Sequence, residues 1–164
     1  MDRRDFLAVF GVGALGASLP RLAGAQQGTP GKAPARPAAL PAMTVYKSAS
    51  CGCCHLWVEH ARANGFTVRT IDTEDLAKVK AELGVPGTLQ SCHTVVVANY
   101  LVEGHVPADD VKRMLKEKPA IRGIAVPGMP IGSPGLEQGP VSGSQRYAVV
   151  AFTTTGQRST FARH

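Results

Sequence analysis

Aromatic side chains are scarce in this chain, which has five Phe, three Tyr and one Trp among 164 residues. Lysines and arginines give a formal net charge of +6, but they are scattered and do not interleave with aromatic residues. Nucleic-acid-binding surfaces combine clustered basic residues with stacking aromatics, so the sequence argues against nucleic acid as a partner. No internal repeat is visible, and the length and the 44% hydrophobic content favour one domain of ordinary size.

The chain also lacks an apolar run of the length that a membrane-spanning helix needs. Its mostly apolar stretch at 6–19 is too short to span a bilayer comfortably. This stretch follows Arg3-Arg4 and precedes Ala23-Gly24-Ala25, a small-residue cleavage pattern. Residues 1–25 are therefore predicted to be a twin-arginine export signal, with an uncleaved membrane anchor as the alternative. Cleavage predicts a periplasmic protein without stable membrane insertion.

Large apolar side chains are almost absent from residues 26–41, which are rich in Pro, Ala, Gly and Gln. A segment of this composition cannot bury enough apolar surface to offset the entropy lost on ordering. We therefore predict a flexible linker at 26–41, followed by a folded domain at 42–164.

Cysteine is rare, with four residues in total, but three of them lie together in the segment 50–55, Ser-Cys-Gly-Cys-Cys-His. Cys51 and Cys54 form a Cys-x-x-Cys pair, and Cys53 adds a third sulfur between them. The fourth cysteine, Cys92, is far away in the sequence and is followed by His93. Four cysteines in an exported protein normally form two disulfides, but the crowding of three of them fits that pattern poorly.

Hydrophobic periodicity predicts alternating strands and helices after the linker. The expected strands cover 43–46, 66–71, 93–97, 100–102, 147–152 and 159–161, and the expected helices are 53–64, a segment with Leu76, Val79 and Leu83 on one face, and a segment that Pro107 opens. Asp72 or Thr73 is the expected cap of the second helix. Residues 123–143, rich in Gly and Pro, show neither pattern, so we predict a long functional loop there.

This order of elements is that of an α/β thioredoxin-like fold, in which a central mixed sheet is flanked by helices and a cysteine pair follows the first strand. In this architecture the loop entering the third strand lies beside the N-terminus of the first helix. Cys92 occupies that loop. We therefore expect Cys92 to approach the first three cysteines, with the Gly/Pro-rich loop near the same site.

Thiols at a helix N-terminus lose their protons more readily and become nucleophiles or metal ligands. A disulfide oxidoreductase needs two thiols, and a third one such as Cys53 invites wrong pairing. Cu(I) makes use of additional thiolates. Because Cys53 and Cys54 are adjacent on a helix, they point about 100° apart and suit neighbouring ions better than one shared ion. The sequence thus predicts a polynuclear Cu(I) site in which thiolates bridge between ions.

Three other interpretations stay open on these residues. Cys51 as nucleophile and Cys54 as resolving thiol would make a periplasmic thiol-disulfide oxidoreductase. The residues Cys51, Cys54, Cys92 and His93 can supply a tetrahedral zinc site. A structural disulfide with spare thiols is the simplest possibility for an exported protein. Whether the protein turns over copper or thiols as an enzyme is left open by the sequence.

Several further residues are weaker candidates for metal ligands. His55 lies next to the cysteine segment and His93 next to Cys92, so each can be a ligand, a proton-transfer group or an ordinary packed imidazole. His105 sits in a tight connection at a helix start, and Met129 in the long loop has a thioether that suits Cu(I). By contrast, His60 is expected to face solvent.

Five short motifs together resemble the CopG-like family of bacterial periplasmic copper-resistance proteins. They are Cys-Gly-Cys-Cys at 51–54, Ser-Cys-His-Thr at 91–94, Val-Glu-Gly-His-Val-Pro at 102–107, Gly-Ile-Ala-Val-Pro-Gly-Met-Pro at 123–130 and Gly-Ser-Pro-Gly at 132–135. The resemblance covers about residues 43 to 138 of the chain. It leaves out the predicted signal, the linker and the last strands.

The resemblance implies a thioredoxin-like domain that binds copper through a cysteine-bridged Cu(I) cluster, with a link to other periplasmic copper-handling or export proteins. The expected thiolate ligands, carried over by position, are Cys51, Cys53, Cys54 and Cys92. Met129 and His105 also match the family's motifs. One departure is Leu136, which stands where we expect a methionine, so any metal contact of that methionine is missing in this chain.

Overall fold

The structure is a computed structural model that describes residues 39–137 and 144–164. The predicted export signal, the linker up to residue 38 and part of the predicted loop at 123–143 lie outside the described residues. Among the residues described, no helix combines the length and the apolar character that crossing a membrane requires.

Strands and helices alternate through the first part of the described chain, largely as the periodicity predicts. In chain order the elements are β1 (Met43–Lys47), α1 (Gly52–Ala63), β2 (Val68–Asp72), α2 (Leu76–Leu83), the 3-10 turn η1 (Gly87–Leu89), β3 (His93–Val97), β4 (Tyr100–Glu103), α3 (Ala108–Glu117), β5 (Gly123–Ala125), β6 (Ala148–Phe152) and β7 (Arg158–Arg163). Trp57, Val58 and Ala61 form the buried side of α1. Gly65 follows this helix with a φ of 90°, a conformation that favours glycine.

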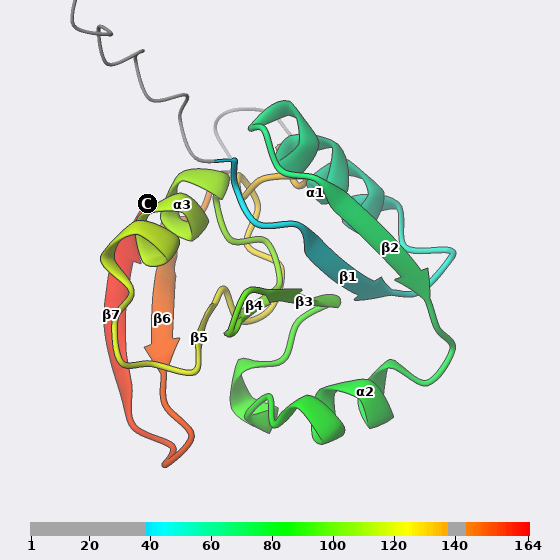
Figure 1. The fold of residues 1–164 in the computed structure, drawn as a ribbon. Coiled ribbons are helices and arrows are strands. Elements are labelled where there is room, and N and C mark those ends of the chain that lie inside the picture. The colour runs from blue at the N-terminus through cyan, green and yellow to red at the C-terminus, as the bar shows by residue number, and fades with distance from the viewer. Residues whose placement is uncertain (1–38, 138–143) are drawn as a thin grey trace, which may run out of the picture. The chain divides into compact units, whose positions relative to one another are not determined.

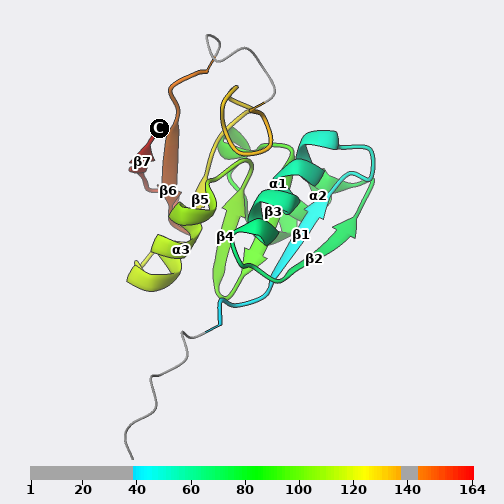
Figure 2. The ribbon, with the colours of Figure 1, turned by 90° about the horizontal axis from the view of Figure 1, so that it is seen from above.

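The described strands form a mixed seven-stranded sheet in the order β2-β1-β3-β4-β5-β6-β7. The β1–β2 and β4–β5 pairs are parallel, and the other neighbours are antiparallel. Figure 2 shows β2, β1, β3 and β4 side by side, with α1 crossing one face. The α/β class with a central mixed sheet is confirmed, and the arrangement is compatible with a thioredoxin-like fold.

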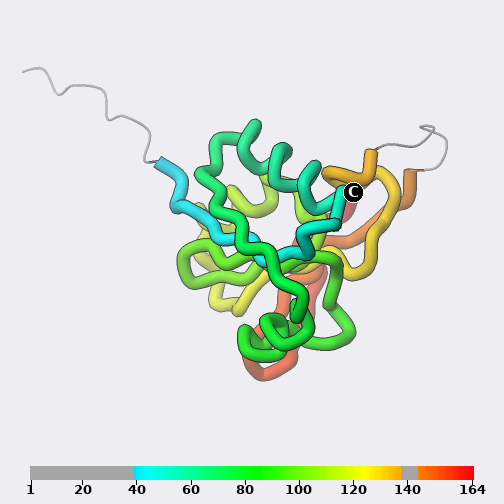
Figure 3. The backbone as a smooth tube through the Cα atoms, turned by 90° about the vertical axis from the view of Figure 1, so that its right-hand side faces the viewer, coloured from blue at the N-terminus to red at the C-terminus, as the bar shows by residue number. Residues whose placement is uncertain are grey.

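The two faces of the sheet pack against different helices. One face carries the larger apolar cluster, to which α1 contributes Trp57 and α3 contributes Val111 and Met114. The opposite face carries a smaller cluster that includes Val85, which precedes η1, and Leu89, the last residue of η1. Leu83 of α2 packs against this cluster. Figures 1 and 3 show α1 and α2 on opposite sides of β1 and β3. A residue of β3 therefore faces either α1 or α2, depending on its position in the strand.

Two expectations for the local structure were wrong. The segment predicted to be loop from residue 123 begins with β5, a fully buried three-residue strand that pairs with both β4 and β6. The cap of α2 is Asp75, whose carboxylate accepts the backbone N–H of Lys78, and not Asp72 or Thr73. The reason is that Asp72 remains in β2, where it is paired with Lys47.

Candidate metal centre

The four cysteines come together at one edge of the sheet. Cys51 is the N-cap of α1, and Cys53 and Cys54 lie in the first turn of that helix. Cys92 immediately precedes β3. Because β1 and β3 are antiparallel and Lys47 pairs with His93, the end of β1 and the start of β3 lie together. The pairing of two strands thus carries Cys92 to the N-terminus of α1.

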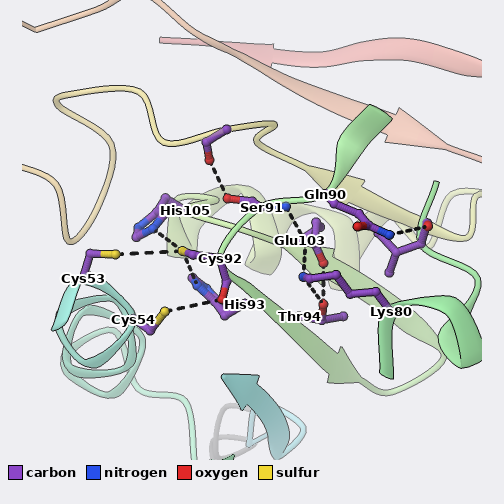
Figure 4. Close-up of polar contacts among 12 residues, drawn as sticks. Cys53, Cys54, Lys80, Gln90, Ser91, Cys92, His93, Thr94, Glu103 and His105 are labelled. Carbon is purple, nitrogen blue, oxygen red and sulfur yellow. Dashed lines mark hydrogen bonds and ion pairs between the residues drawn. The ribbon is translucent and has the colours of Figure 1, made fainter. Parts of the chain in front are cut away.

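All four sulfur atoms lie within 4.8 Å of one another. The Cys53 Sγ is 3.6 Å from the Cys51 Sγ and 3.9 Å from the Cys92 Sγ. Figure 4 shows Cys53 pointing toward Cys92 from α1, with Cys54 directed at the backbone of the same residue. The Cys53 sulfur is therefore in contact range of two other cysteines from different segments.

In this structure Cys51 and Cys54 are joined by a disulfide, and Cys53 and Cys92 are free. A disulfide sulfur carries no thiolate, and the thiolate is the form of cysteine that binds metal. The cluster therefore has an oxidised form with two thiols and a reduced form with four. Cys54 is fully buried, whereas Cys51 is half-buried.

Two imidazoles also approach the Cys92 sulfur. The Cys92 Sγ is 2.8 Å from Nε2 of His105 and 3.3 Å from Nδ1 of His93, and these three ligand atoms also lie within 4.8 Å of one another. Nδ1 of His105 lies 2.8 Å from the Pro134 carbonyl. Because a carbonyl only accepts, Nδ1 carries the proton and donates it, which leaves Nε2 of His105 as an acceptor facing the sulfur.

Both imidazoles are held in the neutral form by their surroundings. Burial lowers the pKa of His93 well below its ordinary value, and the neighbouring His105 and Lys80 add to this effect. Burial also lowers the pKa of His105, although its bond to Pro134 opposes the shift. Neutral imidazole is the form that binds metals, so the site offers nitrogen as well as sulfur donors.

Cys92 itself is a protonated thiol in this arrangement. Burial, together with the nearby Cys53, raises the pKa of Cys92 to about 12. A thiol with this pKa donates its proton to the Nε2 lone pair of His105, the nearest acceptor. Binding of a metal ion to Cys92 must therefore release a proton, because the metal competes for the same sulfur electrons.

The ring of His93 packs against two neighbouring rings, those of Trp57 and His105. Its ring centroid is 4.7 Å from that of Trp57 and 5.1 Å from that of His105, with an edge-on geometry in the second pair. Nε2 of His93 has no hydrogen-bond partner among the described residues, although the side chain is fully buried. The ring is thus fixed in place by packing, with Nδ1 directed at Cys92.

Part of the Gly/Pro-rich loop packs directly against the first turns of α1. A Cβ added to Gly135 would lie 2.9 Å from the carbonyl oxygen of Cys53 and 2.9 Å from the backbone nitrogen of Trp57, so only glycine fits there. Figure 3 shows this yellow-to-orange loop beside the beginning of α1. The expectation of a loop near the site is confirmed for the described residues up to 137.

The remaining candidates lie away from the sulfur atoms or have other partners. His55 is exposed, and its Nε2 lies 3.3 Å from both Lys47 Nζ and the Ala49 carbonyl oxygen. Met129 is 57% exposed. His60 does not face solvent as expected, because its Nε2 accepts the backbone N–H of Ala108 at the start of α3. This contact could not be predicted from the sequence, because the two residues are 48 positions apart in the chain.

Comparison with known proteins agrees with the motif resemblance. A family model described as a protein of unknown function, DUF411, matches residues 89–136. Comparison with curated proteins gives no match. Two solved structures, titled copper resistance protein copG form 1 and form 2, are 46% and 44% identical to this chain. Each comparison covers 76% of this chain and 98% of the other, with a TM-score of 0.71. At this identity and coverage, the chain belongs to the CopG family of copper resistance proteins.

Proposed function

We propose that this protein is a periplasmic Cu(I)-binding protein that sequesters or relays copper through a polynuclear thiolate site and so contributes to copper resistance. The ligands proposed are the thiolates of Cys51, Cys53, Cys54 and Cys92. The observation that carries the proposal is the convergence of these four sulfur atoms within 4.8 Å at the N-terminus of α1. The titles of the related structures, which name copper resistance, support copper as the ion.

The central position of Cys53 favours several ions over one. Its sulfur lies 3.6 Å from the Cys51 sulfur and 3.9 Å from the Cys92 sulfur. A thiolate in contact range of two others can bridge two metal ions, as Cu(I) thiolate chemistry allows. Zinc is less suitable, because a structural zinc ion takes four ligands in one tetrahedron and leaves the other donors unused.

Binding requires two preparatory changes in the side chains. Cys51 and Cys54 must be reduced, because their disulfide holds no thiolate. Cys92 must lose its proton, which its raised pKa opposes until Cu(I) competes for the sulfur. His93 and His105 stand beside Cys92 as neutral imidazoles and are the further ligands that we propose.

A thiol-disulfide oxidoreductase is the second candidate function, because one observation favours it. Cys51 and Cys54 form a disulfide at the start of α1, with Cys51 half-buried and Cys54 fully buried. An accessible nucleophile and a buried resolving thiol are the arrangement that disulfide exchange uses. In this reading Cys53 has no role.

The substitution Cys53→Ser separates the two functions. Our proposal predicts that the reduced variant binds fewer Cu(I) ions per chain than the native protein and does not reduce insulin disulfides. The oxidoreductase predicts the reverse, namely insulin reduction that survives Cys53→Ser. Elemental analysis of the same anaerobic preparations reports zinc as well, and zinc that Cu(I) cannot displace would favour a structural zinc site instead.

We further propose that the protein reaches the periplasm through the twin-arginine pathway and exchanges copper there with other copper-handling proteins. The basis is the Arg3-Arg4 pair before an apolar stretch. Export of a folded chain would allow the thiols to be loaded with copper before they meet an oxidising compartment.

A further inference from the structure

A buried ion pair lies on the face of the sheet opposite His93. Lys80 of α2 and Glu103 of β4 have side chains that are 5% and 0% exposed, and the Lys80 Nζ is 2.5 Å from Oε1 of Glu103. Thr94, the cross-strand partner of Glu103, donates to Oε2 at 2.6 Å and accepts from Lys80 at 2.8 Å. Figure 4 shows these three side chains converging to the right of Cys92.

Stability alone is a weak explanation for this buried pair. Burying two charges costs desolvation energy that their attraction only partly returns, and well-packed apolar residues in such positions are often as stable. The apolar pattern of α2 predicted Leu76, Val79 and Leu83 on the buried side, yet these are half-buried and Lys80 is buried instead. The burial of Lys80 therefore needs an explanation other than the apolar pattern of α2.

Glu103 also holds the backbone of the residue before Cys92. Its Oε1 accepts the Ser91 N–H at 2.7 Å. The Ser91 hydroxyl in turn donates to the Gly128 carbonyl in the Gly/Pro-rich loop. The glycine after Glu103 makes this possible, because a Cβ on Gly104 would lie 2.5 Å from Oγ of Ser91 and 2.7 Å from the Val126 carbonyl oxygen. One carboxylate thus fixes Ser91, which joins the Cys92 segment to the loop.

Successive side chains of β3 point to opposite faces of the sheet, so His93 and Thr94 contact different helices. His93 faces α1 and contacts Cys92, while Thr94 faces α2 and contacts Glu103. The Lys80 ammonium contacts both Oε1 of Glu103 and the hydroxyl of Thr94, so Lys80 holds the carboxylate in place from α2. The segment that contains Cys92 is therefore held by hydrogen bonds on the α2 face of the sheet, whereas the sulfur atoms lie on the α1 side.

We propose that Lys80 and Glu103 are positioning residues for Cys92, and that the carboxylate holds Ser91 so that the Cys92 sulfur faces Cys53 and His105. The consequence for copper rests on the function proposed above, whereas the positioning itself does not. Loss of the carboxylate that accepts the Ser91 N–H should let the segment around Cys92 move away from the sheet more often. Ser91 and Cys92 donate their other hydrogen bonds from their side chains, to the Gly128 carbonyl and to His105.

Two double variants of matched size test this proposal. Both Lys80→Met/Glu103→Gln and Lys80→Met/Glu103→Leu remove the ion pair, but only the glutamine retains an oxygen that can accept the Ser91 N–H. The first assay uses the oxidised protein with Cys53→Ser, in which Cys92 is the one free thiol of the chain. We expect iodoacetamide to label Cys92 about tenfold faster in the leucine variant than in the glutamine variant, from the loss of one hydrogen bond. Equal rates would overturn the proposal.

The second assay measures competition for Cu(I) with all four cysteines present and reduced. We expect the leucine variant to bind Cu(I) at least about tenfold more weakly than the glutamine variant, the size of effect that outer-shell residues usually have. If the native protein binds no Cu(I) but the labelling rates differ as expected, the copper function fails and the positioning stands. If Cu(I) binds and the labelling rates are equal, the positioning fails alone.

Hydrogen exchange on the native protein decides the matter if the leucine variant does not fold. The Ser91 amide should exchange as slowly as the paired amides of β3, because its acceptor is buried. Exchange at the rate of an exposed loop amide would overturn the proposal without any substitution.

Discussion

At the scale of single residues, Cys92 has surroundings unlike those of the other cysteines. Its sulfur contacts both a thiol, Cys53 at 3.9 Å, and an imidazole, His105 at 2.8 Å. Burial makes the charged thiolate unfavourable here, so the residue remains a thiol until a metal ion replaces the proton. Binding of copper to Cys92 thus depends on pH, because the ion must displace this proton.

Labelling of Cys92 should therefore show an unusual pH profile. Its pKa of about 12 means that the reactive thiolate is a minor species at neutral pH. In the copper-free, oxidised protein we expect the alkylation rate to rise about tenfold per pH unit without beginning to level off near pH 9, where an ordinary thiol with a pKa of about 8.5 is already mostly ionised. Peptide mass spectrometry after timed labelling separates Cys92 from Cys53. A plateau near pH 9 for Cys92 would contradict the environment described here.

The sequence allowed part of this residue-scale description to be predicted. The approach of Cys92 to the first three cysteines follows from strand order, and the structure confirms it. The pairing of His105 with the Pro134 carbonyl could not be predicted, because it joins residues 29 positions apart through the path of an irregular loop. The buried position of Lys80 was missed, because periodicity records apolar residues and not the acidic partner that makes the burial of a lysine tolerable.

At the scale of elements, the contact between the loop and α1 is the feature that closes one side of the site. Gly135 has a φ of 86°, and its Cα lies against the backbone of the first turns of α1. A side chain at this position meets backbone atoms, which cannot rotate away. The loop therefore depends on glycine for both its conformation and its packing.

Substitution of Gly135 by alanine should weaken the fold and loosen the loop. We expect a loss of about 2 kcal/mol in the free energy of unfolding, since a strained backbone conformation costs roughly 1–3 kcal/mol and the close contacts add to it. Urea denaturation measures the effect. Gly87→Ala is the matched control, because nothing lies within 4 Å of its added Cβ and its φ is not positive. Equal stabilities of the two variants would show that the loop does not pack as described.

Element types were predictable where the hydrophobic pattern is long and regular, as in α1, β1 and β3. β5 was missed because its three residues, Gly-Ile-Ala, are too few to show an alternation. Its strand character comes from pairing with β4 and β6, which lie on either side of it in the sheet. Such a strand is defined by its neighbours and not by its own sequence.

At the scale of the whole molecule, hydrophobic periodicity alone does not give the order of strands in the sheet; the expected closeness of β1 and β3 came from the match of the element order to a thioredoxin-like fold. The periodicity gives each strand separately, but β1 pairs with β2 and β3 through contacts that are distant in sequence. β6 and β7 extend the sheet beyond residues 43–138, the part of the chain that carries the motifs. The site lies at the other part of the sheet, where β1 and β3 meet, so these last strands do not contribute to the cysteine cluster.

The proposed route of export makes a prediction for the full chain. Replacement of Arg3-Arg4 by Lys-Lys should block export, because the twin-arginine pathway recognises the arginine pair and not merely positive charge. Fractionation of cells that express the native and the substituted chain measures the periplasmic fraction of each. Unchanged export of the lysine form would rule out this pathway, while leaving the metal site unaffected.

The central claim is that the reduced protein holds more than one Cu(I) ion among its four cysteines. Anaerobic titration of the reduced chain with Cu(I), followed by elemental analysis of the separated protein, tests this claim most directly. We predict saturation at several copper ions per chain, since the Cys53 sulfur is within reach of two others. Saturation at a single ion, or no retention of copper, would contradict the polynuclear site.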